Sequence, residues 1–545
     1  MIIYQVFTRL FGADRQMCIP FGSKTRNGCG TMRDFTAKAL NEIRSLGCTH
    51  IWYTGVIEHA SKTGYPSFDI PSDNPDVVKG EAGSPYAIRD YYDIDPDIAN
   101  HPKVRMHEFE LLIRRSHRAK LKVIIDFVPN HVARQYYSDA KPKGVRDLGQ
   151  DDNTSQSFSP DNNFYYLPFE QLHLDNIMSD STYEEKPAKA TGNDNFTAWP
   201  GRNDWYETIK LNYGIDYLSG HKAHFSPTPN TWHKMLDILL YWAAKGIDGF
   251  RCDMAEMVPV EFWEWAVPQV KAAYPKIIFI AEVYNPGLYR SYIHRGQFDY
   301  LYDKVGLYDT LLSVCRGQST HTITDCWKSV DDINGRMLNF LENHDEQRLA
   351  SDFLLGDAKA ALPALLVSSL MHRPFMLYFG QELGERGMDE EGFSGRDGRT
   401  TIFDYWSVQS IRRWRNRGRF DGKLMLPEEQ ALRTCYQQIL RLRERDVFAN
   451  GAFFDLMYAN QHLHRQYAFI RHTKKKFAIV IANFSDTEES ITLNFPEHFF
   501  TFSRIKEKEE ITLTNLLDRK KITVPFSATK PLMITLPARL GVVLS

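Results

Sequence analysis

Short apolar segments alternate along the chain with segments of helical periodicity, and this alternation restricts the fold more than any other feature. The run IIYQVF (2–7) is followed by an amphipathic segment (31–47) and then by THIWYTGV (49–56). Strand, helix and strand in that order form the repeating unit of a parallel sheet. Six more apolar runs follow, LKVIIDFV, GIDGFRCD, KIIFIAEV, FDYLYDKV, GRMLNFLENHD and RPFMLYFGQE. Eight such strands predict a closed (β/α)8 TIM barrel rather than an open sheet.

Two regions interrupt this rhythm. The residues between the third and fourth runs are rich in Asn, Asp, Ser, Pro, Tyr and Trp, and the last hundred residues alternate polar with β-branched side chains, as in QYAFIRHTKKKFAIVIANF. Alternation of this kind is typical of half-buried strands. We therefore predict a barrel domain from 1–130 and 235–445, an inserted domain at 131–234, and a C-terminal all-β domain, a β-sandwich, at 446–545.

Charge and cysteine content restrict the partners and the compartment. The 66 basic and 68 acidic residues give a net charge of -2, which excludes a general attraction to nucleic acid or to an anionic membrane. No apolar run reaches the roughly 18 residues of a membrane span, and the N-terminus lacks the layout of a signal peptide. The seven cysteines are scattered and odd in number, which favours free thiols in a reducing compartment. We expect a cytoplasmic monomer; an exported protein whose signal peptide has been removed would look identical.

Ionisable side chains stand at the ends of four predicted strands. They are Asp126 and His131 at the third, Arg251 and Asp253 at the fourth, Glu282 at the fifth, and His344 and Asp345 at the seventh. In a barrel, the C-terminal ends of the strands meet at one face. Each residue alone has an ordinary structural role, such as a helix cap, a buried ion pair or a satisfied core histidine. Four strand ends together indicate one polar site.

The segments that carry these residues resemble a known family. DFVPNH, GFRCD, IAEVYNP and FLENHD are similar, in order and spacing, to the four motif regions of glycoside hydrolase family 13, the α-amylase family. YAIRDYY (86–92) resembles the family's Tyr-x-x-x-Asp-x-Tyr segment, and IKLNY (209–213) resembles the short motif near the end of its domain B. The resemblance covers essentially the whole chain, with the insert as domain B and the all-β tail as domain C.

The resemblance implies catalytic roles for three carboxylates. Asp253 would be the nucleophile that forms a covalent glycosyl intermediate, and Glu282 would be the general acid and then the base. Asp345 would hold the hydroxyls of the sugar as its ring distorts towards an oxocarbenium-like state. No cofactor is needed for this chemistry.

The resemblance also implies substrate-binding positions around the acids. Arg251 would keep the Asp253 carboxylate ionised, and Asp126 would brace Arg251 or the strand ends. His131 and His344 would donate hydrogen bonds to the sugar. Tyr86 would stack under its ring, and Tyr284 would line the leaving-group side or simply pack as an aromatic residue. Trp199, Trp205 and Tyr206 in domain B are candidates for a further glucan contact.

The sequence departs from the family pattern at two places. Where many starch-cleaving relatives have Lys-His after the fourth strand, this chain has Glu256 and Met257, so we expect Glu256 to change the acceptor side. Asn130 and Asn212 match positions that bind calcium in many relatives, and their amide oxygens suit that ion. A second calcium loop of some relatives corresponds to SKTRNGCGTM, which has lost its acids. A structural calcium ion at Asn130 and Asn212 is left open.

Three functions are compatible with these residues. The leading one is a retaining hydrolase of α-1,4-glucosidic bonds in starch, glycogen or maltooligosaccharides. The second is a transglycosylase, such as a 4-α-glucanotransferase, or an α-glucosidase or isomerase of the same family, which Glu256 motivates. The third is an inactive glucan-binding protein, against which the presence of Asp253, Glu282 and Asp345 argues.

Overall fold

Eight parallel strands close into a barrel at the centre of the molecule. The computed structural model describes residues 1–545, and the strands follow one another around the barrel in the order β1-β16-β15-β14-β13-β12-β5-β2. Their bounds are Ile2–Phe7 (β1), His50–Thr54 (β2), Lys122–Phe127 (β5), Gly249–Cys252 (β12), Ile278–Ala281 (β13), Tyr300–Tyr302 (β14), Met337–Phe340 (β15) and Phe375–Tyr378 (β16). All eight strands lie in the predicted apolar runs, so the predicted barrel is confirmed.

The barrel strands are covered on both faces, which explains their nearly continuous apolar runs. The outer face is covered by helices, which include α3 (Ala37–Ser45), α4 (Arg105–Arg118), α5 (Asn230–Ala244), α6 (Val260–Ala273), α7 (Tyr289–His294), α8 (Asp309–Cys315), α9 (His321–Ser329), α10 (Leu362–Leu370) and α12 (Pro427–Arg441). The predicted amphipathic segment 31–47 is helical only from Ala37, because Thr36 caps the helix by accepting a hydrogen bond from the Ala39 N–H.

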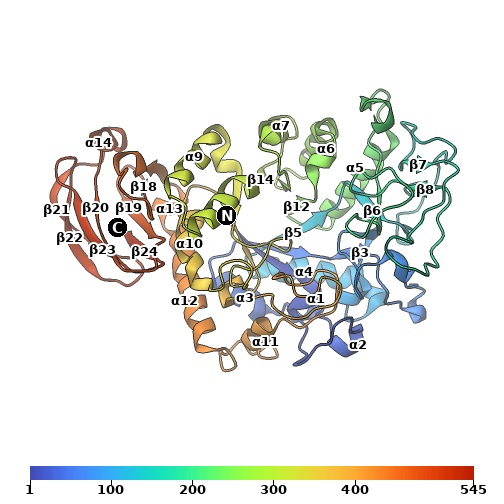
Figure 1. Ribbon diagram of the computed structural model, residues 1–545, viewed down its shortest axis with the longest axis horizontal. Helices are drawn as coiled ribbons and strands as arrows, with labels where there is room; N and C mark the ends of the chain where they lie inside the picture. Colours follow the sequence, from blue (N-terminus) through green and yellow to red (C-terminus); the bar gives the residue numbers. More distant parts are fainter.

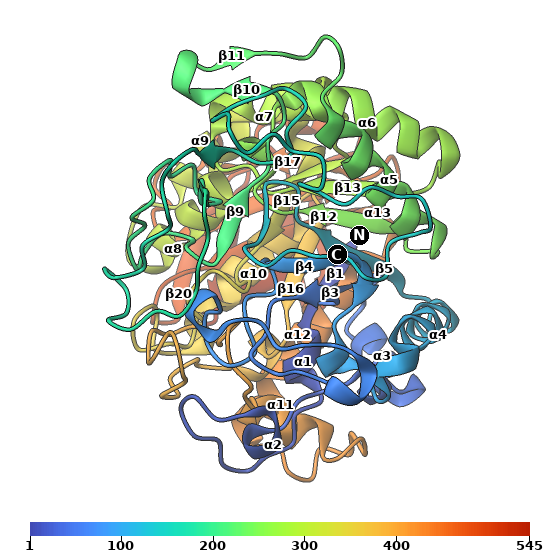
Figure 2. The ribbon, with the colours of Figure 1, turned by 90° about the vertical axis from the view of Figure 1, so that its right-hand side faces the viewer.

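The region between β5 and β12 consists mostly of loops. Its short strands are β6 (His131–Ala133), β7 (Tyr166–Leu167), β8 (Ala188–Lys189), β9 (Thr208–Lys210), β10 (Ile215–Asp216) and β11 (Lys222–Ala223). The strands β6 and β9 pair antiparallel, with His131 opposite Lys210. This insert and the C-terminal region lie on opposite sides of the barrel domain (Figure 1), and β10 and β11 extend beyond the helices in the view of Figure 2.

The C-terminal region is rich in antiparallel strands and also contains a helix. A four-stranded sheet is formed by β17 (Ala452–Asp455), β18 (Gln466–His472), β19 (Phe477–Asn483) and β24 (Gly541–Leu544), and two further pairs by β20 (Glu489–Leu493) with β23 (Leu532–Leu536) and β21 (Lys508–Thr514) with β22 (Lys521–Phe526). The prediction of an all-β region missed the helix α14 (Glu497–Ser503), whose Phe499 and Phe500 pack against Phe526. The domain boundaries themselves remain a prediction.

All seven cysteines are free thiols, as the sequence predicted. Among the helices, none has both the length and the apolar character needed to cross a bilayer.

Candidate active site

One arginine joins carboxylates from three neighbouring strands. Arg251 on β12 lies 2.6 Å (Nη1) from Asp253 Oδ1, 2.9 Å (Nη2) from Glu282 Oε1 and 3.5 Å (Nη1) from Asp126 Oδ1. The strand register explains this, because β12 lies between β5 and β13 and Arg251 stands opposite Asp126. Arg251 is 1% exposed, so the site holds a fully buried cation among acids.

Three aromatic rings complete the surroundings of Arg251. Its Cζ lies 5.2 Å from the Trp52 ring, 5.5 Å from Tyr86 and 5.4 Å from Tyr302. The Tyr302 hydroxyl accepts a hydrogen bond of 3.2 Å from Arg251 Nε. The electron-rich faces of such rings favour a cation, so the guanidinium is held in one place by charge and by ring geometry.

Burial raises the pKa of both Asp253 and Asp345, and neighbouring charges modify this rise. Desolvation raises the pKa of Asp253, and the Arg251 guanidinium opposes this rise while Glu282 and Asp345 reinforce it. Asp345 is half-buried, and desolvation, followed by the negative charge of Glu282, raises the pKa of its carboxyl to about 7. Without the buried arginine, the ionised form of Asp253 would be far less favourable.

The carboxyl of Glu282 is oriented by two further donors. Its Oε2 accepts a 2.8 Å hydrogen bond from the Met254 N–H, and its Oε1 accepts one of 2.6 Å from the Tyr284 hydroxyl. Met254 has φ 41°, in the left-handed region that non-glycine residues rarely adopt. Such strained backbone is common at functional sites, and here it lies directly beside the Glu282 carboxyl. Tyr284 therefore contacts Glu282 directly.

Gln5 and Tyr86 fix His344. Gln5 Nε2 lies 2.8 Å from His344 Nδ1, and because the amide nitrogen is a donor, Nδ1 must accept. The ring proton is then on Nε2, which lies 2.6 Å from the Tyr86 hydroxyl and 3.1 Å from Asp345 Oδ2. Burial and the charge of Arg251 lower the pKa of His344 well below its ordinary value, so the ring is a neutral donor.

His131 is held by a similar arrangement. The Asn130 amide Nδ2 donates to His131 Nδ1 over 3.2 Å, so the His131 proton also lies on Nε2. Burial, followed by the charges of Lys210 and Lys79, lowers the pKa of His131 to about 3. Trp205 packs on this ring with a centroid distance of 5.1 Å.

Asp253, Glu282 and Asp345 line one cavity of about 420 Å³, a size typical of small-molecule sites. Of the residues predicted from the sequence, Tyr86, His131, Trp205, Asp253, Glu282, Tyr284 and Asp345 line it. Arg251 and His344 lie directly behind this lining, in contact with Asp253 and Asp345 respectively, and Asp126 lies behind Arg251. Glu256 is outside the lining, and its Oε2 accepts a 2.9 Å hydrogen bond from the Asn285 N–H.

Comparison with known proteins decides the family. The model of the α-amylase catalytic domain matches residues 17–414 of this chain. The chain belongs to the α-amylase family. Neopullulanase 2 of Thermoactinomyces vulgaris is 23% identical over 470 residues, which are 84% of this chain but 63% of that protein. Alpha-amylase 3 of Dictyoglomus thermophilum is 21% identical over 550 residues, 96% of this chain and 92% of that protein.

Solved structures of the α-amylase family share the fold. The maltogenic α-amylase AmyB of Thermotoga neapolitana superposes with a TM-score of 0.63 at 20% identity, over 100% of this chain and 98% of that one. A cyclomaltodextrinase superposes with a TM-score of 0.65 at 18% identity, over 100% of this chain and 78% of that one.

Part of the wall of this cavity consists of residues that the sequence did not predict. Lys79 and Glu207 form a 2.9 Å ion pair in the wall, and both are buried. Ile402 and Phe403 line the wall from a loop after β16. No strand pattern marks these residues, because loops far apart in the sequence bring them together.

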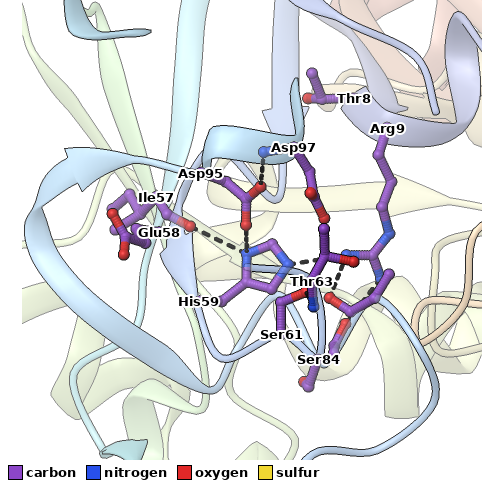
Figure 3. Close-up of polar contacts among 12 residues, drawn as sticks. Thr8, Arg9, Ile57, Glu58, His59, Ser61, Thr63, Ser84, Asp95 and Asp97 are labelled. Atoms are coloured by element: carbon purple, nitrogen blue, oxygen red, sulfur yellow. Dashed lines mark hydrogen bonds and ion pairs between the residues drawn. The ribbon is translucent and has the colours of Figure 1, made fainter. Parts of the chain in front are cut away.

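A buried network of hydrogen bonds around Arg9 connects two of the loops that line the cavity (Figure 3). Arg9, in the short helix α1 (Thr8–Phe11) after β1, donates from Nη1 to His59 Nε2 over 2.8 Å and from Nη2 to the carbonyls of Gly83 and Ile402. His59 Nδ1 lies 2.9 Å from Asp95 Oδ2. Ser84 and Phe403, which follow the residues that carry these two carbonyls, line the cavity. The network therefore holds two parts of the cavity wall in place.

The two amides expected to bind calcium have other partners. Asn212 donates from Nδ2 to the carbonyls of Ser159 and Asn162, and its Oδ1 accepts from the Gly214 N–H. Asn130 Oδ1 accepts from the Lys210 ammonium. No cluster of three His, Cys, Asp or Glu side chains suited to a metal occurs. These residues do not fit a calcium ion.

Proposed function

We propose that this protein is a retaining glycoside hydrolase that cleaves α-1,4-glucosidic bonds in starch, glycogen or maltooligosaccharides. The observation that carries the proposal is Arg251, which holds the carboxylates of Asp253 and Glu282 at 2.6 and 2.9 Å in the wall of the cavity. Two carboxyl groups that flank one sugar are the machinery of retaining glycosidases. Membership of the α-amylase family supports the same assignment.

In the first half of the reaction, the glycosidic bond is exchanged for an ester. Asp253 attacks the anomeric carbon while the protonated Glu282 gives its proton to the glycosidic oxygen. The bond between the anomeric carbon and that oxygen breaks, its electron pair stays with the oxygen, and the leaving sugar departs as an alcohol. The Met254 N–H and the Tyr284 hydroxyl keep the Glu282 carboxyl in one orientation for this step.

In the second half, water replaces the ester. Glu282, now a carboxylate, takes a proton from water as the water oxygen bonds to the anomeric carbon. Asp253 leaves with the electron pair of the ester bond, and Arg251 stabilises the carboxylate that forms. Two inversions at the same carbon give net retention of configuration.

The remaining cavity groups bind the sugar at the cleaved position. His131 lines the cavity and is neutral with its proton on Nε2, so it donates a hydrogen bond to a sugar hydroxyl without adding charge. His344 lies behind the lining, and its Nε2 proton faces the Tyr86 hydroxyl and Asp345 Oδ2, so it orients these two groups towards the sugar. Asp345 accepts from hydroxyls as the ring flattens, which stabilises the transition state more than the ground state. The Tyr86 ring packs on the apolar face of the sugar.

A transglycosylase is the second candidate, because it uses the same intermediate with a sugar in place of water. Glu256 supports it: this carboxylate stands where many relatives have lysine, and it binds the Asn285 N–H in the loop that carries Tyr284. An α-glucosidase or isomerase would use the same residues on other substrates. An inactive glucan-binding protein would not need the paired acids.

We also propose that the protein acts as a cytoplasmic monomer on α-glucan chains, without nucleic-acid or membrane partners and without a cofactor for the chemistry. Seven free thiols and a net charge of -2 support this assignment.

A time course on maltoheptaose tests the proposal. Total reducing ends and the lengths of the products are measured together, with the Asp253→Asn protein as the control. Hydrolysis predicts reducing ends that rise with time. Constant reducing ends, with longer and shorter chains appearing together, would support the transglycosylase. No reaction with any α-glucan would contradict both.

A further inference from the structure

Lys210 lies where three separate segments of the chain meet. It is the last residue of β9 in the insert, and its side chain is 2% exposed. Its Nζ lies 2.6 Å from Asp194 Oδ1 and 3.3 Å from the Met257 carbonyl oxygen, and it donates a hydrogen bond to Asn130 Oδ1. Asn130 follows β5, Met257 follows β12, and Asp194 belongs to the insert. One ammonium group therefore joins the insert to two strands of the barrel.

We propose that the Lys210 ammonium is a built-in cation that takes the place of a structural metal ion at this junction. A carboxylate, an amide oxygen and a carbonyl oxygen are the ligand types that calcium prefers. All three point at a group with three N–H donors and no acceptor. A divalent ion cannot share these oxygens with an ammonium ion, because the two cations repel each other at such distances.

The same contacts make Lys210 a positioning residue for the active site. The ammonium fixes the Asn130 amide with its oxygen towards Nζ, so the Nδ2 group faces the Gly192 carbonyl at 2.7 Å and His131 Nδ1 at 3.2 Å. This orientation keeps the His131 proton on Nε2, the nitrogen left to donate to substrate. The part of the inference that concerns His131 rests on the proposed function; the part that concerns the cation does not.

Calcium dependence tests the built-in cation without any assay of activity. The melting temperature Tm of the wild-type protein is measured after dialysis against EDTA and again with calcium chloride, and we expect the same Tm in both. The Lys210→Met protein, which loses the charge but keeps the length, should melt roughly 3–8 °C lower because Asn130 and Asp194 lose their shared partner. A wild-type Tm that falls in EDTA and recovers with calcium would overturn the proposal.

Lys189 provides a matched control. It is also in the insert and pairs with Glu185 at 3.4 Å, but its side chain is 21% exposed and its ammonium is paired within the insert. We expect Lys189→Met to change Tm by less than about 1 °C. If Lys210→Met melts at the same temperature as Lys189→Met, the three oxygens do not need a cation and the proposal is wrong.

A double-mutant cycle tests whether Lys210 affects activity through His131. We expect Lys210→Met and His131→Ala each to lower kcat/KM on maltoheptaose, by roughly 5–10-fold for Lys210→Met. If Lys210 acts through His131, the double variant should be no slower than His131→Ala alone. Multiplicative losses would show that Lys210 supports the fold only and would overturn the positioning role. Absence of activity in the wild type would refute the proposed function and leave the Tm result unaffected.

Discussion

Replacing Arg251 by methionine removes the cation that three barrel carboxylates share. Arg251 is 1% exposed and lies 2.6 Å from Asp253 and 2.9 Å from Glu282. Breaking a buried ion pair on one side leaves an uncompensated buried charge, which costs about 3–5 kcal/mol. If that cost falls on the ionised nucleophile, kcat/KM on maltoheptaose near neutral pH falls by about 10²–10³-fold or more.

The losses of stability and activity in Arg251→Met should grow as the pH rises, because the buried carboxyls ionise as the pH rises. Burial raises the pKa of Asp126 to about 6, and it also raises the pKa of Asp253. Without Arg251 both values rise further, so the folded variant binds protons that the unfolded chain releases. Its deficit in the free energy of unfolding, relative to the wild type, is therefore largest above about pH 7 and shrinks as the pH falls below about 5, where these acids are protonated in both folded proteins. The acidic limb of the activity profile moves to higher pH.

The assay is kcat/KM across pH, together with urea unfolding at an acidic and a neutral pH. Arg348→Met is the control, because Arg348 is 0% exposed and pairs with Glu342 at 2.8 Å but does not contact Asp253. The control should lose stability and keep the acidic limb of the wild type. The reasoning is refuted if Arg251→Met keeps more than about a tenth of the wild-type kcat/KM near neutral pH, with the limb in its original place.

Three further substitutions test single residues of the site. Asp253→Asn should abolish turnover and leave maltoheptaose binding measurable by calorimetry, and robust turnover would show that another group is the nucleophile. Gln5→Leu removes the donor that holds His344 Nδ1, so kcat/KM should fall roughly 5–10-fold while Tm stays within a few degrees; unchanged kinetics would mean that Tyr86 alone orients His344. Glu256→Lys should change the ratio of hydrolysis to transfer, measured as reducing ends against product lengths, and an identical product pattern would remove Glu256 from the acceptor side.

The barrel and its acids could be predicted because both follow local rules. Apolar runs separated by helical segments gave the strands, and the ends of those strands contain Asp126, Asp253 and Glu282. Gln5 and Tyr302 lie on barrel strands as well, and a search at strand positions for polar side chains other than acids and histidines would have found them. The helix α14 was missed because EHFFTFS, rich in aromatic residues, suits a strand as well as a helix.

The cavity wall could not be predicted, because contacts distant in sequence determine it. Arg9 and Ile402 are 393 residues apart in the chain, and no periodicity connects them. The resemblance matched Asn130 to a calcium-binding position, but in the structure its amide oxygen accepts a hydrogen bond from the Lys210 ammonium. The residue responsible, Lys210, lies within the segment IKLNY, where its positive charge next to candidate metal ligands was the available signal.

Trapping the glycosyl-enzyme tests the central claim most directly. The Glu282→Gln protein is incubated with α-glucosyl fluoride, whose leaving group needs no acid, and the intact mass is measured before the chain is digested and mapped. The mechanism predicts that the protein gains the mass of one glucosyl group and that the modified peptide carries it on Asp253. A label on another residue, or hydrolysis of the fluoride with inverted configuration and no label, would contradict it.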